Sequence, residues 1–345
     1  MARKYKIGVL RGDGIGPEIV NAALDILNEL DLDISFVELE AGYSYFQKTG
    51  RSMEENFFDK VKELDAVLKG PLYTPPGVKE FKSVNIIIRK ELDLYANIRP
   101  FKSFEGISLK NFNIVLIREN IEDVYVGIEG RFKDKAISLR IITFDGSRRV
   151  AEYAFRYAID RGFNKVTVIH KANILKETDG LFREVFYSVS KKYPDIIADE
   201  LIVDTAAYTI VKNPEKLQVI LAPNLYGDIL ADLLAGMVGS LGLCGSAQIG
   251  RDIAVFEPIH GVALDIAGKG IANPIGEILS AKMMLEHIGH QYKDDKFIKA
   301  SEIIEKAIHI VLEKKKIWTY DLGGDNKTKD VVRALINTIN ELSIY

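Results

Sequence analysis

The chain has 345 residues, 47% of them apolar and 28% charged, which is typical of a globular protein with about two domains. Its 46 basic residues nearly balance 49 acidic ones, giving a net charge of −3. This balance argues against nucleic acid or an anionic membrane as the main partner, because both select basic proteins. The single cysteine, Cys244, excludes an intramolecular disulfide and a cysteine-based metal site. The sequence shows no signal peptide and no long apolar run, so we expect a soluble cytoplasmic protein.

Short β-branched runs alternate with longer helical patterns along the chain. We expect strands at residues 6–10, 66–69, 114–117, 165–169 and 217–221. The clearest predicted helices span residues 17–30, 148–161, 178–192, 274–288 and 295–314. Strands that alternate with helices predict an α/β layered fold with a largely parallel sheet.

Residues 12–18 read Gly-Asp-Gly-Ile-Gly-Pro-Glu and lie between a predicted strand and a predicted helix. The glycines permit a positive φ, and Pro17 suits the first turn of a helix. A Rossmann dinucleotide loop is one interpretation, but its third glycine would fall at position 17, which is proline. We therefore favour a tight strand-to-helix turn, which can still lie beside a ligand without cradling its phosphates.

Three arginines, Arg89, Arg99 and Arg118, each lie near a strand end or in a segment flanked by turns. Ser83 and Asn85 precede the first of them. Guanidinium groups bind carboxylates in a bidentate geometry, so the three together suit a substrate with several carboxyl groups. The alternative, for each arginine taken singly, is a surface salt bridge.

Lys171 directly follows the predicted strand at residues 165–169. Ligands of α/β folds bind at the carboxyl ends of the strands, and a partly desolvated lysine there can act as an acid or a base. The alternative is a solvated loop lysine. The adjacent His170 is more typical of packing than of catalysis.

Asp228 and Asp232 are four residues apart in a helical segment and therefore share one helix face. Two like charges at this spacing repel each other unless a cation lies between them. The segment 224–239 contains no lysine or arginine, so Mg²⁺ or Mn²⁺ is a reasonable guest. The alternative is a pair of solvated aspartates near a helix start, where negative charge is favourable.

Seven motifs now follow one another along essentially the whole chain. They lie at residues 12–18, 93–100 (Asp-Leu-Tyr-Ala-Asn-Ile-Arg-Pro), 118–120 (Arg-Glu-Asn), 170–173 (His-Lys-Ala-Asn), 224–232 (Asn-Leu-Tyr-Gly-Asp-Ile-Leu-Ala-Asp), 257–261 (Glu-Pro-Ile-His-Gly) and 265–274 (Asp-Ile-Ala-Gly-Lys-Gly-Ile-Ala-Asn-Pro). In this order they resemble the β-decarboxylating dehydrogenases, a family that comprises isocitrate, homoisocitrate and 3-isopropylmalate dehydrogenases. The motifs are most similar to those of the NAD-dependent isocitrate dehydrogenases.

The resemblance implies the two-domain α/β fold of this family, which is not a Rossmann fold. Residues 1–99 and 251–345 would form a large cofactor-binding domain. Residues 100–250 would form a small central domain that carries the dimer interface and the metal site. The resemblance further implies a homodimer, or a higher oligomer, in which each active site is completed by the neighbouring subunit.

The resemblance also implies roles for individual residues. The substrate-binding residues would be Ser83, Asn85, Arg89, Arg99 and Arg118. Tyr125 and the partner's Lys171 would transfer protons, and the divalent metal would be bound by Asp228, Asp232 and the partner subunit's Asp204. The implied reaction passes hydride to a nicotinamide and then releases carbon dioxide, with the metal stabilising the enolate.

The cofactor would be NAD. By resemblance, its binding residues are Glu257, His260, Gly261, Asp265, Ile266 and Asn273. In NAD-using members an aspartate occupies the position of Asp265, where it accepts the adenosine ribose hydroxyls and repels a 2′-phosphate. NADP-using members tend to carry lysine and tyrosine at the positions of Asp265 and Ile266.

The substrate prediction depends on Ser83 and Asn85. Isopropylmalate enzymes place leucine at the position of Asn85, whereas isocitrate enzymes show the Ser-x-Asn-x-x-x-Arg pattern found at residues 83–89. A hydroxyl and an amide can bind the additional carboxylate that leucine would leave without a partner. Isocitrate is therefore the expected substrate. Homoisocitrate, one methylene longer, is the first alternative and 3-isopropylmalate the second.

Several residues depart from the pattern of the family. They are Ile121, Phe144, Cys244 with Gly245, Val262 and Leu264. The departures motivate an alternative of another class, a regulatory subunit that binds ligands without turnover. Because Tyr125, Lys171 and all three metal-binding aspartates are retained, we favour the enzyme.

Overall fold

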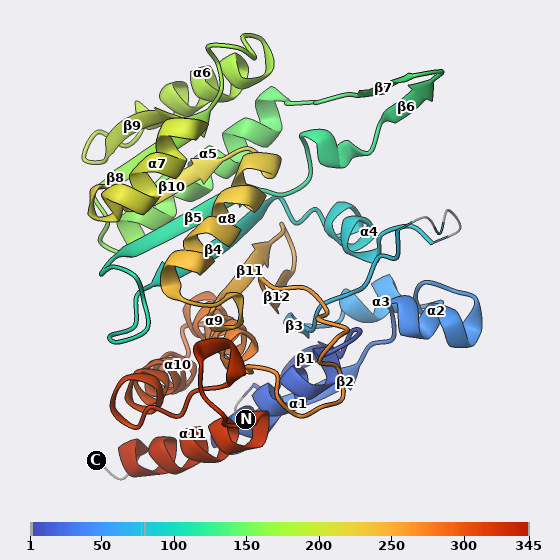
Figure 1. Cartoon of the computed structure of the whole chain (residues 1–345), viewed down its shortest axis with the longest axis vertical. Coiled ribbons are helices and arrows are strands. Elements are labelled where there is room, and N and C mark those ends of the chain that lie inside the picture. The colour runs from blue at the N-terminus through green and yellow to red at the C-terminus, as the bar shows by residue number, and fades with distance from the viewer. Residues whose placement is uncertain (1–2, 77, 79–80, 344–345) are drawn as a thin grey trace. The chain divides into compact units, whose positions relative to one another are not determined.

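The computed structural model describes residues 3–76, 78 and 81–343 (Figure 1). These residues divide into two compact units. Unit 1 comprises the described residues within 1–92, 104–108 and 239–345, and unit 2 comprises residues 93–103 and 109–238. Each unit is an α/β layered structure, which confirms the predicted fold class.

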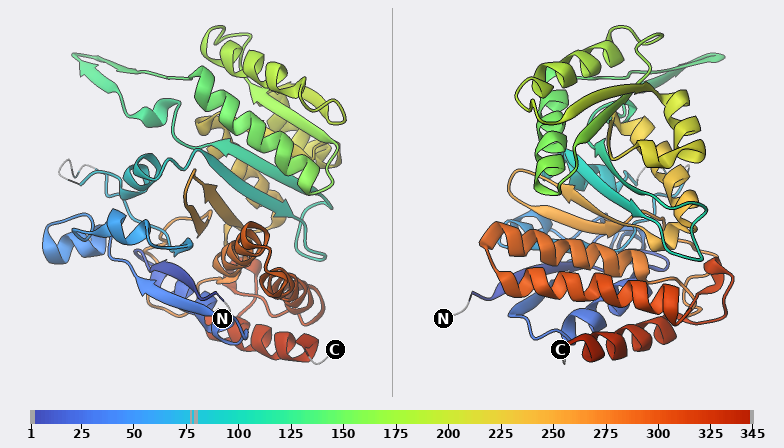
Figure 2. Two further views of the ribbon diagram at one scale, coloured as in Figure 1. Left: turned by 180° about the vertical axis from the view of Figure 1, so that it is seen from behind. Right: turned by 90° about the vertical axis from the view of Figure 1, so that its left-hand side faces the viewer.

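Unit 1 is built on strands in the order β2-β1-β3-β12-β11. All neighbouring pairs are parallel except β11 with β12, which are antiparallel. Helix α9 packs on β3, β11 and β12, and α10 and α11 form a further layer against α9 and α1 (Figure 2). The elements are β1 (Tyr5–Leu10), α1 (Gly16–Asn28), β2 (Ile34–Glu38), α2 (Tyr43–Thr49), α3 (Phe57–Val61), β3 (Ala66–Lys69), α4 (Val84–Glu91), β11 (Gly245–Ile249), β12 (Ala254–Pro258), α9 (Ile275–Tyr292), α10 (Asp295–His309) and α11 (Thr328–Ser343).

Unit 2 is built on strands in the order β4-β5-β10-β8-β9. Within this sheet β4 and β5 are antiparallel, and the other described neighbouring pairs are parallel. Helices α5 and α6 pack together on one face, and α7 and α8 pack together on the other (Figure 2). The elements are β4 (Ala96–Lys102), β5 (Asn113–Glu119), β6 (Glu129–Phe132), β7 (Lys135–Ser138), α5 (Phe144–Asp160), β8 (Lys165–His170), α6 (Thr178–Ser190), β9 (Ile197–Ile202), α7 (Val203–Lys212), β10 (Val219–Ala222) and α8 (Asn224–Val238).

Strands β6 and β7 form an antiparallel hairpin that projects away from the helices of unit 2 (Figure 1). Its residues are exposed, including the large apolar side chains of Phe132 and Ile137, which are 73% and 69% exposed. Two more exposed apolar residues, Ile128 and Leu139, flank the hairpin. An apolar surface of this kind is typical of a protein–protein contact.

Local sequence signals account for the predicted elements. All five predicted strands are present, as β1, β3, β5, β8 and β10, and they are almost wholly buried. Pro17 lies in the first turn of α1, whose apolar side chains recur with helical spacing and face the core. The predicted helix at residues 295–314 is α10 followed by a turn of π-helix at Ile310–Lys314. In the part of the chain that the structure describes, no helix is both long and apolar enough to cross a membrane.

One carboxyl group lies inside the core of unit 1. Glu277, on α9, is fully buried. Neither of its carboxyl oxygens has a hydrogen-bond partner among the described residues. Burial raises the pKa of Glu277 well above its usual range, and the carboxylate of Glu257 adds to this, against the attraction of Lys69. The folded protein therefore holds this group in its protonated form at pH values where the unfolded chain has lost the proton.

We predict that Glu277→Leu stabilises the fold. Replacing a buried carboxyl that lacks a partner by an apolar group of similar size should raise the free energy of unfolding by about 1–3 kcal/mol. Because the folded pKa is raised, the destabilising effect of Glu277 grows as the pH rises above its unfolded value, and the gain should be larger at pH 8 than at pH 5. Urea unfolding at both pH values measures this. A loss of stability at both would show that the carboxyl makes a stabilising bond.

Candidate active site

Three other predicted site residues in unit 2 contact the carboxylate of Asp228. Asp228 lies near the start of α8. Arg118, near the end of β5, donates from Nη1 to Oδ1 of Asp228. Arg99, on β4, has its Nη1 3.5 Å from the same oxygen, and the hydroxyl of Tyr125 donates to Oδ2 at 2.6 Å. The structure therefore places two cationic groups and a phenolic proton around one carboxylate.

Both arginines of this cluster are buried, at 5% exposure for Arg99 and 1% for Arg118. Oδ1 of Asn224 accepts from Nε and Nη2 of Arg118 at 2.9 and 2.7 Å. Gly227 makes room for the stem of Arg118, because a Cβ atom there would lie 2.6 Å from Cγ of the arginine. The first turn of α8 thus fixes the orientation of the Arg118 guanidinium, and this role of Asn224 and Gly227 was not predicted from the sequence.

Tyr125 is held beside Asp228 by a buried carboxylate, that of Asp123. Tyr125 lies in a short 3-10 turn, Val124–Val126, which Asp123 caps. Asp123 accepts from the backbone N–H of Val124 at 2.8 Å and from that of Leu225, at the start of α8, at 2.9 Å. One carboxylate therefore joins the turn that carries Tyr125 to the helix that carries Asp228.

Arg140 connects this turn to the segment around Lys171. Its Nε lies 2.9 Å from Oδ1 of Asp123, and its Nη2 lies 3.2 Å from Oδ1 of Asp179. Asp179, fully buried at the start of α6, accepts from the backbone N–H of Lys171 at 2.6 Å. A single guanidinium thus takes part in positioning both predicted proton-transfer residues. This role of Arg140 was not predicted, since no local pattern connects Asp123, Arg140 and Asp179 along the chain.

Lys171 and Asp204 form a second group in unit 2. Lys171 directly follows β8, and its Nζ makes an ion pair with Oδ1 of Asp204 near the start of α7. Asp204 is exposed, and its bond to Lys171 lowers the pKa of its carboxyl. The structure thus joins a predicted catalytic residue to a predicted metal ligand, a pairing that the sequence did not suggest.

The carboxylates of α8 have the chemistry that a hard divalent cation requires. Asp232 lies one helical turn after Asp228, and partial desolvation, followed by repulsion from Asp228, raises the pKa of its carboxyl. A cation between the two would relieve this repulsion, and one or two carboxylates completed by water and substrate oxygens suit Mg²⁺ or Mn²⁺. No three acidic, histidine or cysteine side chains among the described residues gather to hold a metal ion. Within the described part of a single chain, Asp204 therefore does not lie beside Asp228 and Asp232 as a third metal ligand.

In unit 1, helix α4 carries the predicted substrate residues Ser83, Asn85 and Arg89. Ser83 occupies the N-cap position of α4, and its side chain makes no capping hydrogen bond to the described residues. Nδ2 of Asn85 lies 3.5 Å from the carbonyl oxygen of Leu72, and the buried Oδ1 has no hydrogen-bond partner within the described part of the chain. This oxygen is an acceptor and is available to a donor group of a ligand, such as a hydroxyl, whereas a carboxylate would be bound through Nδ2. Because Arg89 lies in unit 1 and the other two arginines in unit 2, their joint binding of a substrate stays a prediction.

Arg89 is oriented by a buried polar network. Its Nε donates to Oε1 of Gln248, on β11, at 2.9 Å. Gln248 in turn donates to Oε1 of Glu257, on β12, and Nη2 of Arg89 lies 3.8 Å from that oxygen. The other oxygen of Glu257 pairs with Lys69 at the end of β3, which is only 1% exposed. Lys69 and Gln248 were not identified from the sequence.

The predicted cofactor residues, apart from Glu257, lie in the segment between β12 and α9, residues 259–274, here called the cofactor loop. Asp265 and Gly261 are exposed, whereas Ile266 is half-buried. Burial lowers the pKa of His260, whose Nδ1 lies 3.0 Å from the carbonyl oxygen of Gly261. Asn273 is buried and donates to Asp321 at 3.0 Å.

The glycine loop at residues 12–18 is a tight turn, as predicted. Gly12 and Gly14 have φ values of 75° and 61°. A Cβ atom would lie 2.2 Å from the carbonyl oxygen of Pro71 at Gly12 and 2.1 Å from that of Val262 at Gly14. Backbone amides of the turn donate to these same carbonyls, from Asp13 at 2.8 Å and Ile15 at 2.9 Å. Protein carbonyls therefore occupy these amides, and the turn does not present them to a phosphate.

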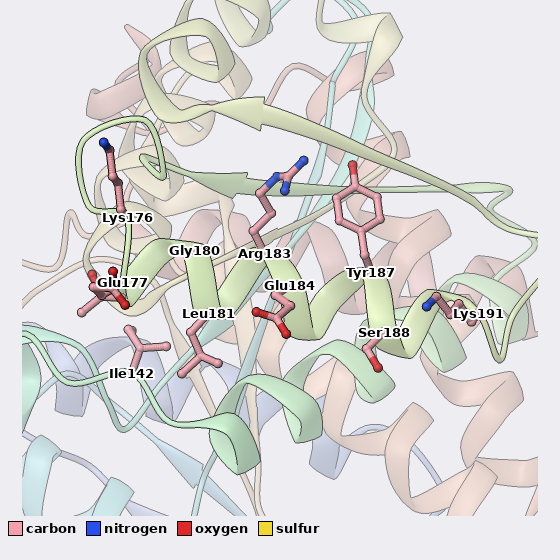
Figure 3. Close-up of a pocket in the computed structure, with 11 residues that line it drawn as sticks. Ile142, Lys176, Glu177, Gly180, Leu181, Arg183, Glu184, Tyr187, Ser188 and Lys191 are labelled. Carbon is pink, nitrogen blue, oxygen red and sulfur yellow. The ribbon is translucent and has the colours of Figure 1, made fainter.

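A hollow of about 870 Å³ runs along α6 (Figure 3). Charged and polar side chains of α6 line it, among them Arg183, Glu184, Tyr187 and Lys191. None of the residues predicted from the sequence is among its described lining residues. The size of this hollow alone does not make it the site.

The buried carboxyl group of Glu119, between Arg118 and Asn120, should make the free energy of unfolding depend on pH. It is 2% exposed, and burial raises its pKa to about 7 in spite of backbone N–H bonds from Ile121 and Glu122. A raised carboxyl pKa destabilises the fold progressively as the pH rises from the unfolded value to the folded one. Glu119→Gln, which keeps the acceptor oxygen, should therefore gain about 2 kcal/mol relative to the parent protein between pH 5 and pH 7.

Chemical unfolding across this pH range measures the effect of Glu119→Gln. The control is Glu152→Gln, because a bond from Lys192 lowers the pKa of Glu152, the direction opposite to that of Glu119. The control should show no such trend between pH 5 and pH 7. If the difference in free energy of unfolding between Glu119→Gln and the parent protein also stayed constant from pH 5 to pH 7, Glu119 would be ionised throughout this range.

Comparisons with known proteins show the family of this chain. A family model described as isocitrate/isopropylmalate dehydrogenase matches residues 6–335. A homoisocitrate dehydrogenase of Methanocaldococcus jannaschii is 46% identical over 97% of this chain and 98% of its own length. A 3-isopropylmalate dehydrogenase of Methanothermobacter thermautotrophicus is 41% identical over 98% of this chain and all of its own. An isocitrate/homoisocitrate dehydrogenase of Thermus thermophilus is 42% identical over 98% of this chain and 99% of its own.

Solved structures give the same result. The crystal structure of an isocitrate dehydrogenase from Methylococcus capsulatus matches with a TM-score of 0.91 and 41% identity, over 97% of this chain and 99% of that one. The family model and these relatives span nearly the whole chain. The protein therefore belongs to the isocitrate/isopropylmalate dehydrogenase family, the β-decarboxylating dehydrogenases.

Proposed function

We propose that the protein catalyses the NAD-dependent oxidative decarboxylation of a 2-hydroxy tricarboxylic acid, with isocitrate as the leading substrate. The observation that carries this proposal is the polar start of α4, where Ser83 and Asn85, whose Nδ2 can donate to a carboxylate, precede Arg89. A pocket for an isopropyl group would instead require apolar side chains there. Homoisocitrate is the second candidate, because relatives named for it are 46% and 42% identical to this chain.

The buried charges of the site suit a substrate with several carboxylates. Arg99 and Arg118 would bind substrate carboxylates through their fixed guanidinium groups, and Ser83, Asn85 and Arg89 would bind the carboxylate that distinguishes isocitrate from isopropylmalate. Buried polar groups left without partners penalise a substrate that lacks the matching group. Specificity would therefore come from the start of α4.

The proposed chemistry assigns a proton to each of two residues. When bound, NAD accepts the hydride of the secondary alcohol, and a divalent cation held by Asp228, Asp232 and the partner subunit's Asp204 stabilises negative charge on the oxygen. The partner's Lys171 takes the hydroxyl proton. Tyr125, whose hydroxyl already donates to Asp228, gives its proton to the enolate carbon after carbon dioxide leaves.

A homodimer is part of this proposal. In the described chain Lys171 pairs with Asp204, whereas Tyr125 bonds to Asp228. In a dimer, the Lys171–Asp204 pair of each copy would complete the site built around Tyr125 and Asp228 of the other copy. The central domain, residues 100–250, would carry this interface and the metal site, and residues 1–99 with 251–345 would bind NAD. The exposed apolar side chains of the β6–β7 hairpin and of Ile229 on α8, which is 60% exposed, support a contact between copies.

Substrate and cofactor are tested together by measuring NADH formation with Mg²⁺. We expect kcat/KM to be highest for isocitrate with NAD, then for homoisocitrate, with 3-isopropylmalate and NADP far lower. Asn85→Leu should lower kcat/KM for isocitrate by roughly 10- to 100-fold, the effect of one lost polar contact in a buried site. A preference for homoisocitrate would overturn the pocket argument and keep the mechanism. NAD binding without turnover on any substrate would favour a regulatory subunit.

The proposed role of Tyr125 predicts a selective loss of turnover. Tyr125→Phe removes the proton donor, so kcat should fall by about 100-fold or more, as for general acids elsewhere. KM for the substrate should change little, because the arginines stay in place. Tyr187→Phe is the matched control, since that phenol also bonds to a carboxylate, Glu200, in unit 2. Equal kinetics for both variants would remove Tyr125 from the mechanism.

A further inference from the structure

We propose that Glu18 is a positioning residue for the cofactor loop, and that the glycine loop at residues 12–18 clamps the cofactor loop at both ends. This inference rests on the proposal that residues 257–273 bind NAD. It gives the glycine loop a function other than the phosphate cradle that its glycines first suggest.

The first end of the clamp is made by backbone atoms. The N–H of Ile15 donates to the carbonyl oxygen of Val262 at 2.9 Å. The approach is so close that a Cβ atom at Gly14 would lie 2.1 Å from that oxygen. Gly14 also has a positive φ of 61°, which side chains rarely adopt. The glycine at position 14 is therefore required for the contact.

The second end is made by the carboxylate of Glu18, in the first turn of α1. One oxygen accepts from the N–H of Ala272 at 2.9 Å, and the other from the N–H of Gly270 at 3.3 Å. The hydroxyl of Thr328, at the start of α11, bonds to the same carboxylate and to the carbonyl oxygen of Ala272, at 2.6 Å from the latter. Bonds from backbone N–H groups to a carboxylate are charge-assisted and stronger than neutral ones.

Between its two ends the cofactor loop packs on α1. Ile15, Ile19 and Ala272 form a buried apolar cluster, against which Ala263, Ile266 and Ala267 are packed. The loop is also strained, because Ala263 has a φ of 40° without being glycine. Such a conformation persists only where the surroundings hold it. The clamp thus fixes the backbone on either side of the exposed Asp265, the residue proposed to bind the adenosine ribose.

The expected consequence is an effect on cofactor binding rather than on chemistry. Glu18→Gln keeps the shape of the side chain but loses the charge of its hydrogen bonds, so the Kd for NADH and the KM for NAD should rise about 10-fold. Glu18→Ala should raise both further. At saturating NAD, kcat and the KM for isocitrate should stay within about twofold of the parent values. The reason is that Glu18 bonds to Gly270, Ala272 and Thr328, none of which is a proposed substrate-binding residue.

The test combines NADH titration by fluorescence, steady-state kinetics and hydrogen exchange of the loop amides. Exchange at Gly270 and Ala272 should be faster in Glu18→Gln, with or without cofactor. Glu54→Gln is the matched control, since Glu54 accepts from the N–H of Glu40 at 3.1 Å and pairs with Lys60, outside the cofactor loop. Asp265→Ala is the reference for a residue that binds the cofactor directly.

The outcomes separate the clamp from the proposed function. If Asp265→Ala weakens NADH binding and Glu18→Gln does not, the clamp is overturned and the cofactor site stands. If Glu18→Gln weakens the binding of isocitrate and of NADH equally, and Glu54→Gln has the same effect, the role of Glu18 is merely structural. The clamp is then again overturned. If the parent protein binds no NADH, or Asp265→Ala binds as well as the parent, the assignment of the cofactor site fails and the inference fails with it.

Discussion

The side chain of Arg118 is 1% exposed, and a charge removed so far from water is tolerated only when it is paired and fully hydrogen-bonded. The start of α8 meets this requirement with the carboxylate of Asp228, the amide of Asn224 and the space left by Gly227. The position of β5 relative to α8 follows from this pairing. So does the position of Tyr125, because its hydroxyl bonds to the other oxygen of Asp228.

Unit 1 also contains a buried cation, which different residues neutralise. Lys69 is as deeply buried as Arg118, and Glu257 neutralises it while also accepting from Gln248. The network extends to Arg89, whose side chain is 13% exposed. Glu277 is the exception in this region, because its carboxyl is buried without a hydrogen-bond partner among the described residues. The core of unit 1 thus contains both a satisfied and an unsatisfied carboxyl group.

Much of the fold could be predicted from the sequence, because strands such as β3 and β10 are short buried apolar runs and helices such as α1 carry a clear apolar period and a proline at the start. The residues proposed to carry the chemistry, among them Tyr125, Lys171 and Asp228, were singled out by motifs. The residues that hold them were not. Asp123 and Leu225 are about a hundred positions apart, and no local pattern shows that two such residues bond. The same is true of Arg89 and Gln248.

The position of Arg140 has a consequence for an assembly of two copies. Its guanidinium lies between Asp123, which caps the turn of Tyr125, and Asp179, which holds the backbone of Lys171. In the proposed homodimer these two proton-transfer residues of one chain serve different catalytic centres. The ion pairs of Arg140 would then connect the support of Tyr125 in one centre with the support of Lys171 in the other, so the two centres of the dimer would share one guanidinium.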